Sequence, residues 1–118
     1  MTIALNLFPR NDYDIPVSIV DADGVAVDIR GWSITFTAKQ IANPQLPNSE
    51  AALLYTWAVG SGEAAVSGET TMCLTKDQLD LPIREYECDL QGIDLYYKTH
   101  TIDVGILSIS RKVNTDDI

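Results

Sequence analysis

Apolar and polar residues alternate along most of this chain, in short segments that end at turn-forming residues. The alternation is clearest between residues 32 and 39, where one face carries Trp32, Ile34, Phe36 and Ala38 and the other carries Ser33, Thr35, Thr37 and Lys39. A period of two residues is typical of a β-strand with one buried and one solvated face, and helical periodicity is nearly absent. The pattern therefore predicts an all-β protein.

Further strands are expected on both sides of this segment, bounded by Gly, Pro, Asn or Asp. Their ranges are 3–7, 15–19, 25–29, 53–59, 70–75, 85–90 and 99–110, with 25–29 as a short return strand. The Asp-Ala-Asp-Gly sequence at 21–24 predicts a tight turn before that return strand, because Asp and Gly tolerate positive φ.

Two local features refine this prediction. Residues 75–82 begin with a capping hydroxyl, that of Thr75, and end at Pro82, which indicates a single helical turn between two strands. In the last strand Gly105 interrupts the apolar alternation, as a β-bulge would.

Seven or eight short strands favour two packed antiparallel sheets, because so many apolar faces have to meet another apolar layer. The leading architecture is an immunoglobulin-like antiparallel β-sandwich, and a small β-barrel is the alternative. Residues 1–110 are predicted to form one domain, followed by a polar, acidic C-terminal tail at 111–118. A loop at 41–50, punctuated by Pro44 and Pro47, is the expected flexible element.

Length and charge narrow the possible functions. At 118 residues and 46% apolar content, the chain is long enough to form one hydrophobic core without disulfides or metals. Eight basic and seventeen acidic residues give a net charge of -9, which disfavours nucleic acid and anionic membranes as partners. The apolar stretch at 3–8 has no basic region before it, is interrupted by Asn6 and ends at Pro9, so neither a signal peptide nor a membrane span is expected.

No cofactor or metal site is expected. Cys73 and Cys88 are too few for a disulfide framework, and together with the single His100 they lack the ligands and spacing of a zinc site. If strands 70–75 and 85–90 form a hairpin, Cys88 points inward beside Met72 and Cys73 lies on the other face. We expect two free thiols.

No catalytic site is recognisable, so the protein is not expected to be an enzyme. His100 has no triad partners that the sequence identifies. Three carboxylates, those of Glu85, Glu87 and Asp89, share one strand face, which we interpret as the solvated face of an antiparallel strand. A metal-assisted hydrolase built on these three residues and His100 is the least favoured hypothesis.

Two pairs of aromatic residues are candidates for binding. Tyr55 and Trp57 share their strand face with Leu53 and Val59, so we assign that pair to the core rather than to a platform for sugar rings. The adjacent residues Tyr96 and Tyr97 differ, because neighbouring strand residues point to opposite faces and one of them is expected to be exposed.

The candidate partner contacts are therefore Tyr96, Tyr97 and the nearby Asp94. An exposed tyrosine in this position suits contact with a protein, because Tyr is enriched at protein interfaces. A small carbohydrate- or ligand-binding module that uses Tyr96 or Tyr97 is the alternative hypothesis.

The order of several segments resembles a known domain. These segments are NDYDIP (11–16), DGVAVDIRGW (23–32), ITF (34–36), LTKDQL (74–79), EYECDL (85–90) and DVGILSI (103–109). Together they look like the β-sandwich domain at the N-terminus of phage baseplate upper proteins and related tail or fibre components. The resemblance covers residues 11–110, nearly the whole predicted domain.

The resemblance implies a non-enzymatic phage or prophage structural protein of the tail or baseplate, made in the host cytoplasm. Its partners would be phage structural proteins or copies of itself, and it would be oligomeric in the assembled particle. In such phage proteins the domain docks onto the distal hub of the tail, and a longer C-terminal part carries receptor binding. This sequence ends about eight residues after its last predicted strand, so only the docking role is carried over.

Overall fold

The computed structural model describes residues 2–41, 47 and 51–111. They form seven strands and one short helix: β1 (Thr2–Leu7), β2 (Tyr13–Ser18), β3 (Ser33–Gln40), β4 (Leu53–Ala58), α1 (Glu63–Val66), β5 (Glu69–Leu74), β6 (Glu85–Ile93) and β7 (Thr99–Ile109). The prediction of an all-β protein is confirmed. Most of the predicted loop at 41–50 and of the predicted tail lies outside the described residues. No helix in the described ranges is long and apolar enough to cross a membrane.

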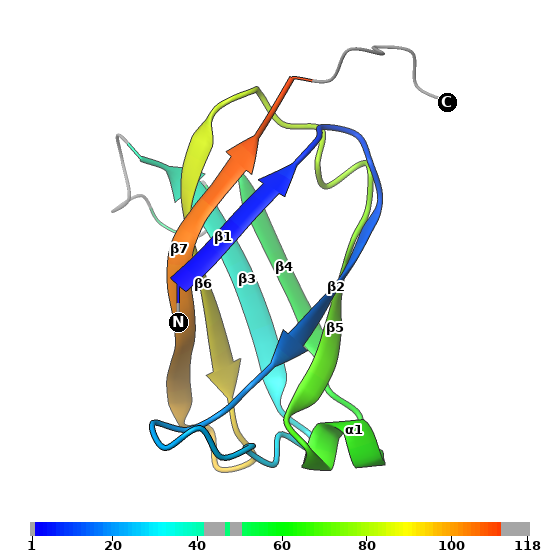
Figure 1. The fold of residues 1–118 in the computed structure, drawn as a ribbon, viewed down its shortest axis with the longest axis vertical. Helices are drawn as coiled ribbons and strands as arrows, with labels where there is room; N and C mark the ends of the chain where they lie inside the picture. Colours follow the sequence, from blue (N-terminus) through cyan, green and yellow to red (C-terminus); the bar gives the residue numbers. More distant parts are fainter. Residues whose placement is uncertain (1, 42–46, 48–50, 112–118) are drawn as a thin grey trace.

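The strands form two sheets that face each other (Figure 1). The larger sheet has the order β1-β7-β6-β3-β4, and the smaller one pairs β2 with β5. This arrangement is an immunoglobulin-like sandwich, in which the third, sixth and seventh strands lie together in one sheet and the second and fifth in the other. The predicted architecture is therefore confirmed.

One pairing differs from the predicted antiparallel arrangement. β1 runs parallel to β7, with Leu5 opposite Leu107, so the five-stranded sheet is mixed. The alternation of apolar residues in a strand is the same whichever way the strand runs. It therefore predicts which residues face inward but not the direction of a neighbouring strand.

The core lies between the two sheets. On β3, the face predicted to be buried is completely enclosed, since Ile34, Phe36 and Ala38 are each 0% exposed. Met72 and Leu74 of β5 are also buried and belong to the same cluster. Burial of each large apolar side chain contributes about 1.5–3 kcal/mol, so these side chains dominate the stability of the sandwich.

The predicted return strand at 25–29 is wrong. Only a single bridge, between Val20 and Ala26, forms in this segment. The tight turn before it is present, because the Asp21 side chain accepts hydrogen bonds from the backbone N–H groups of Asp23 and Val25 at 2.9 and 3.0 Å. Farther along, the Val27 N–H donates to the Ile19 carbonyl and the Ile29 N–H donates to the carbonyl of Ala65 in α1, both at 3.0 Å, so the segment bonds to two different neighbours instead of forming a ladder.

The predicted hairpin between 70–75 and 85–90 is also wrong, because β5 and β6 belong to different sheets. The helical turn between them is confirmed: the Leu79 N–H donates to the Thr75 carbonyl at 3.1 Å, and the Gln78 N–H donates to the Thr75 hydroxyl at 3.4 Å. The inward position of Cys88 and the outward position of Cys73 are confirmed as well, and both thiols are free.

The irregularity in the pairing of the last strand is not at Gly105, where a bulge is predicted. Pairing of β6 with β7 is regular through Gly105 and shifts between Leu90 and Gln91, which lie opposite Asp103 and Thr101. Gly105 has another role, since a Cβ atom there would collide with the backbone of Ile3 in β1. The glycine is needed for close approach of the parallel strand rather than for a bulge.

Candidate functional site

The connection between β6 and β7 is a tight turn at the same end of the molecule as α1 (Figure 1). The backbone of Asp94 bonds to that of Lys98 at 3.0 Å, and the Tyr97 N–H donates to the Asp94 carbonyl at 3.1 Å. The Asp94 carboxylate accepts hydrogen bonds from the N–H groups of Tyr96 and Lys98 at 2.8 and 3.0 Å. Asp94, predicted as a partner contact, thus shapes the turn that presents the two tyrosines.

Three adjacent large side chains project from this turn into solvent. Leu95 is 66% exposed, Tyr96 83% and Tyr97 89%, and we call these three residues the tip cluster. The prediction of an exposed tyrosine in this pair is confirmed, and both tyrosines are exposed rather than one. The alternation of strand faces does not apply to them, since both lie in the turn and not in a strand. Leu95 is not among the predicted contacts, because the local sequence does not show whether an apolar residue near a strand end will be covered.

Tyr97 is held in a conformation that its residue type disfavours. Its φ is 60°, in the left-handed region. For a residue with a Cβ atom this conformation costs about 1–2 kcal/mol. A glycine or asparagine at this position of the hairpin would avoid the cost. The turn therefore carries a bulky aromatic residue where backbone stability alone favours a small one.

A packed base supports the tip cluster. The ring of His100 stacks on that of Trp32, with centroids 4.9 Å apart and an interplanar angle of 16°. His100 Nε2 lies 2.9 Å from Asp94 Oδ2, which links the stack to the turn. Gly92 lies opposite His100, and a Cβ atom there would come within 2.7 Å of the Trp32 ring. The base is therefore a fixed arrangement of ring, carboxylate and backbone.

A hollow of about 600 Å³ lies beside the tip cluster. Its lining residues are Asp28, Arg30, Gly31, Trp32, Ser61, Asp94, Leu95 and Tyr96. Two of them form an exposed ion pair, in which Arg30 donates to both carboxylate oxygens of Asp28, the shortest contact being 2.6 Å. The hollow thus combines aromatic walls with fixed charged groups.

Hydrogen bonds stabilise the charged forms of both carboxylates in this hollow. The bond to His100, followed by those from the turn backbone, lowers the pKa of Asp94 below its ordinary value. The side-chain and backbone bonds from Arg30 lower the pKa of Asp28 in the same way. Both groups therefore stay ionised at neutral pH, which suits binding better than proton transfer.

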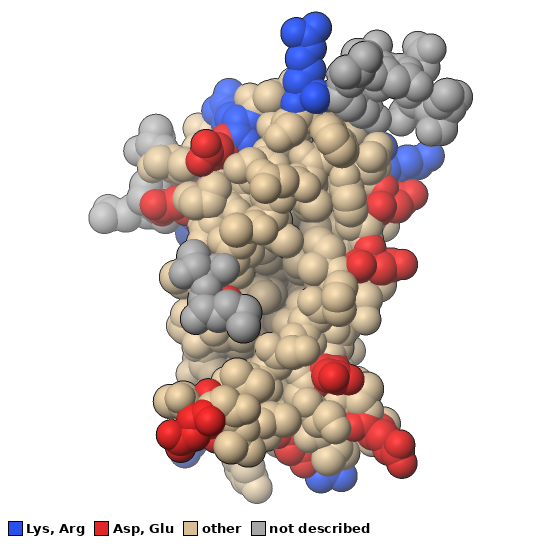
Figure 2. All heavy atoms as spheres, viewed as in Figure 1, with Lys and Arg blue, Asp and Glu red and all other residues tan. Residues whose placement is uncertain are grey.

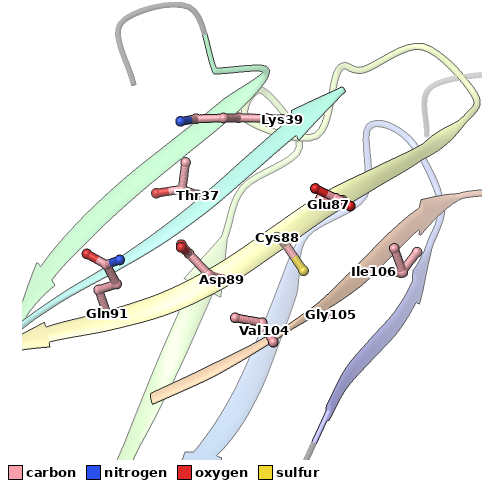
Figure 3. Close-up of a pocket in the computed structure, with 9 residues that line it drawn as sticks. All are labelled: Thr37, Lys39, Glu87, Cys88, Asp89, Gln91, Val104, Gly105 and Ile106. Carbon is pink, nitrogen blue, oxygen red and sulfur yellow. The ribbon is translucent and has the colours of Figure 1, made fainter. Parts of the chain in front are cut away.

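A second hollow, of about 450 Å³, lies on the outer face of the five-stranded sheet (Figure 3). Its lining side chains include Lys39 from β3, Glu87 and Asp89 from β6, and Val104 from β7. In Figure 3 the sulfur of Cys88 points to the other side of β6, where burial raises its pKa to about 12. The prediction that the acidic residues of this strand lie on its solvated face is confirmed.

The residues of the least favoured hypothesis, a metal-assisted hydrolase, do not converge. His100 pairs with Gly92 near one end of β6, whereas Glu85 lies at the other end of that strand. In the part of the chain that the structure describes, no group of three or more His, Cys, Asp or Glu side chains is placed to hold a metal ion. The tip cluster and the adjacent hollow are therefore the main candidate site.

No family model, curated protein or solved structure matches this chain.

Proposed function

We propose that the protein is a non-enzymatic assembly domain that binds a protein partner through the tip cluster, as a structural component of a phage or prophage tail or baseplate. The observation that carries the proposal is the exposure of Leu95, Tyr96 and Tyr97, which lie next to one another and are 66–89% exposed. Binding energy at protein interfaces is concentrated in a few such side chains, tyrosine among the foremost.

The support beneath the tip cluster favours binding. Hydrogen bonds from the backbone to Asp94 fix the turn, and the stacked pair of Trp32 and His100 holds its base. A turn that is ordered before it binds loses less conformational entropy in the complex. Retention of Tyr97 in the left-handed region also fits this role, because strained residues persist where function needs them.

The negative charge at the end of the molecule that carries the tip cluster favours a partner with a basic surface. Exposed carboxylates at this end include those of Asp21, Asp23 and Glu63. Figure 2 shows most Lys and Arg side chains of the viewed face gathered at the opposite, upper end. A positively charged partner surface would be attracted to the acidic end, so high salt is expected to slow association.

Assignment to a phage particle rests on the resemblance of six segments to the N-terminal domain of baseplate upper proteins. The partner is then another phage structural protein or a further copy of this chain, and the protein is made in the host cytoplasm before incorporation.

Quantitative mass spectrometry of purified tailed particles, from a strain that encodes the chain, tests this assignment. A fixed ratio to the major tail protein, in multiples of three or six, is the expected result for a symmetric tail. Consistent absence from the particles would overturn it.

The role of the tip cluster is tested by incorporation of variants supplied in trans. The double variant Tyr96→Ala/Tyr97→Ala is expected to enter particles at least tenfold less efficiently, because loss of a binding hot spot costs about 2 kcal/mol or more. Ile83→Ala is the matched control, since Ile83 is also an exposed apolar residue (55%) but lies in the connection at the other end of β6. Equal incorporation of both variants would exclude the tip cluster as the docking surface.

The hollow beside Tyr96 favours one second candidate, a carbohydrate-binding module. Trp32 and Tyr96 both line this hollow, and aromatic rings are suitable surfaces for sugar rings. Binding on a glycan array that Tyr96→Ala removes would support this function. Absence of binding on such an array, with normal incorporation into particles, would exclude it.

A further inference from the structure

The two sheets differ in how their exposed edges are protected. Unpaired edge strands invite pairing with another chain, and proteins usually block them with charged residues or proline. β2 carries Asp14 and Pro16, and β5 begins with Glu69. β4, with the sequence LLYTWA, has neither a charge nor a proline, and it pairs with β3 alone among the described residues.

The lack of charge extends beyond the strand itself. Residues 51–62, which contain β4 and its flanks, include no Asp, Glu, Lys, Arg or His, although the chain has a net charge of -9. Two copies of such an acidic protein repel each other over most of their surfaces. Along β4, where residues 51–62 carry no charge, this repulsion between two copies is weaker.

Side chains on β4 are also incompletely covered. Tyr55 and Trp57 point toward the core, where their rings stack with centroids 5.4 Å apart, yet both stay half-buried. Their cover is partial because a two-stranded sheet lies against a five-stranded one. The Trp57 indole N–H donates to the Thr70 hydroxyl at 3.0 Å, which holds the ring in place. On the other face of the strand Leu54 is 47% exposed.

We propose that β4 is a self-association edge, along which the β4 strands of two copies pair antiparallel about a two-fold axis. The two five-stranded sheets would then join into one continuous sheet. A two-fold axis perpendicular to the sheet keeps both inner faces on the same side, so Tyr55 and Trp57 of the two copies form one apolar row. This interface is separate from the tip cluster and does not depend on the proposed function.

A second copy is the occupant that this edge fits best. Antiparallel pairing of a strand with itself is self-complementary, because each unpaired N–H and C=O of one copy meets its counterpart in the other. β1, the other edge of the same sheet, is also uncharged but has small or polar residues, Ala4 and Asn6, on the face where β4 has Leu54. Among the strands that the structure describes, β4 alone combines an uncharged edge with incompletely buried aromatic rings.

Sedimentation velocity of the full chain over a dilution series tests the proposal. The wild-type protein is expected to shift from monomer to dimer as its concentration rises. Leu54→Lys adds a positive charge to the edge strand of each copy, so two like charges come together in the interface, and it is expected to weaken dimerisation at least tenfold. Val104→Lys is the matched control, because Val104 is similarly exposed (54%) but lies on β7, which has a partner strand on each side. It is expected to dimerise like the wild type.

A monomer at every concentration would overturn the proposal, as would equal dimerisation of wild type and Leu54→Lys or equal loss in Leu54→Lys and Val104→Lys. Hydrogen exchange of the wild-type protein gives a second test, which does not depend on the folding of any variant. Amide protection in residues 53–58 should rise between dilute and concentrated samples while protection in residues 94–98 stays constant. Unchanged protection in 53–58 would contradict pairing along β4.

Discussion

The connection that leads into β6, residues 75–84, completely buries one of its two leucines, whereas the connection that leaves β6, residues 94–98, exposes its single leucine. Leu79 in the first is 0% exposed and Leu95 in the second is 66% exposed. Tyrosines follow the same division: Tyr86 is 1% exposed after the first connection, and Tyr96 is 83% exposed within the second. Each connection is held by a side chain bonded to its own backbone, Thr75 in one and Asp94 in the other.

Topology explains the contrast. The first connection crosses from the small sheet to the large one, and although most of its residues are exposed, Leu79 reaches the core between the sheets. The Arg10 N–H donates to the Leu79 carbonyl at 3.0 Å, and the Tyr86 hydroxyl donates to the Pro82 carbonyl at 2.9 Å. The second joins neighbouring strands of one sheet and projects beyond it. Apolar residues there add little to the core, so the fold itself does not account for their presence.

The largest expected effect is the difference in the free energy of unfolding between substitutions of Leu79 and Leu95. Leu79→Ala should lower the free energy of unfolding by about 2–5 kcal/mol, because it removes buried methyl groups and leaves a cavity. Leu95→Ala should change it by no more than about 0.5 kcal/mol, as is usual for exposed positions. Urea denaturation monitored by tryptophan fluorescence measures both. Similar losses in the two variants would mean that the turn at 94–98 contributes to the core after all.

A smaller effect, of opposite sign, is expected within the tip cluster. Tyr97→Gly should raise the free energy of unfolding by about 1 kcal/mol, because glycine adopts positive φ without the Cβ penalty. Tyr96→Gly is the control and should not be stabilising, since Tyr96 is not among the residues with positive φ. Thermal unfolding followed by circular dichroism compares them. Destabilisation by Tyr97→Gly would show that the aromatic side chain supports the fold rather than a binding surface.

The smallest effect concerns the base of the turn. Because hydrogen bonds lower the pKa of Asp94 in the folded state, its contribution to stability is present above the ordinary Asp value and is lost as pH falls through the folded pKa. His100→Phe keeps a ring against Trp32 but removes the bond, so the pKa of Asp94 should rise toward the ordinary value of about 3.9. NMR titration of the carboxylates measures this change. The pKa of Asp28, which depends on Arg30, should not move.

Much of the sandwich could be predicted residue by residue. Alternation correctly assigned Ile34 and Phe36 to the core and Glu87 to the solvated face, and turn chemistry correctly located the turn that begins at Asp21. The adjacency of Tyr96 and Tyr97 correctly predicts an exposed ring, but the expectation that the two rings point to opposite faces applies only within a strand, and both residues lie in the turn between β6 and β7. Leu95 was overlooked, because an apolar residue near a strand end gives no local signal of whether anything will cover it.

The sequence by itself determined which side chains share a face and where the backbone turns, because both depend on the geometry of a few consecutive residues. Only the tertiary structure decided that β1 runs parallel to β7, that Ile29 bonds to Ala65 of α1 while no strand forms at 25–29, and that β4 lies at an edge of the large sheet. Each of these outcomes depends on which distant segment lies alongside, and a local pattern of residues carries no information about its neighbour in space.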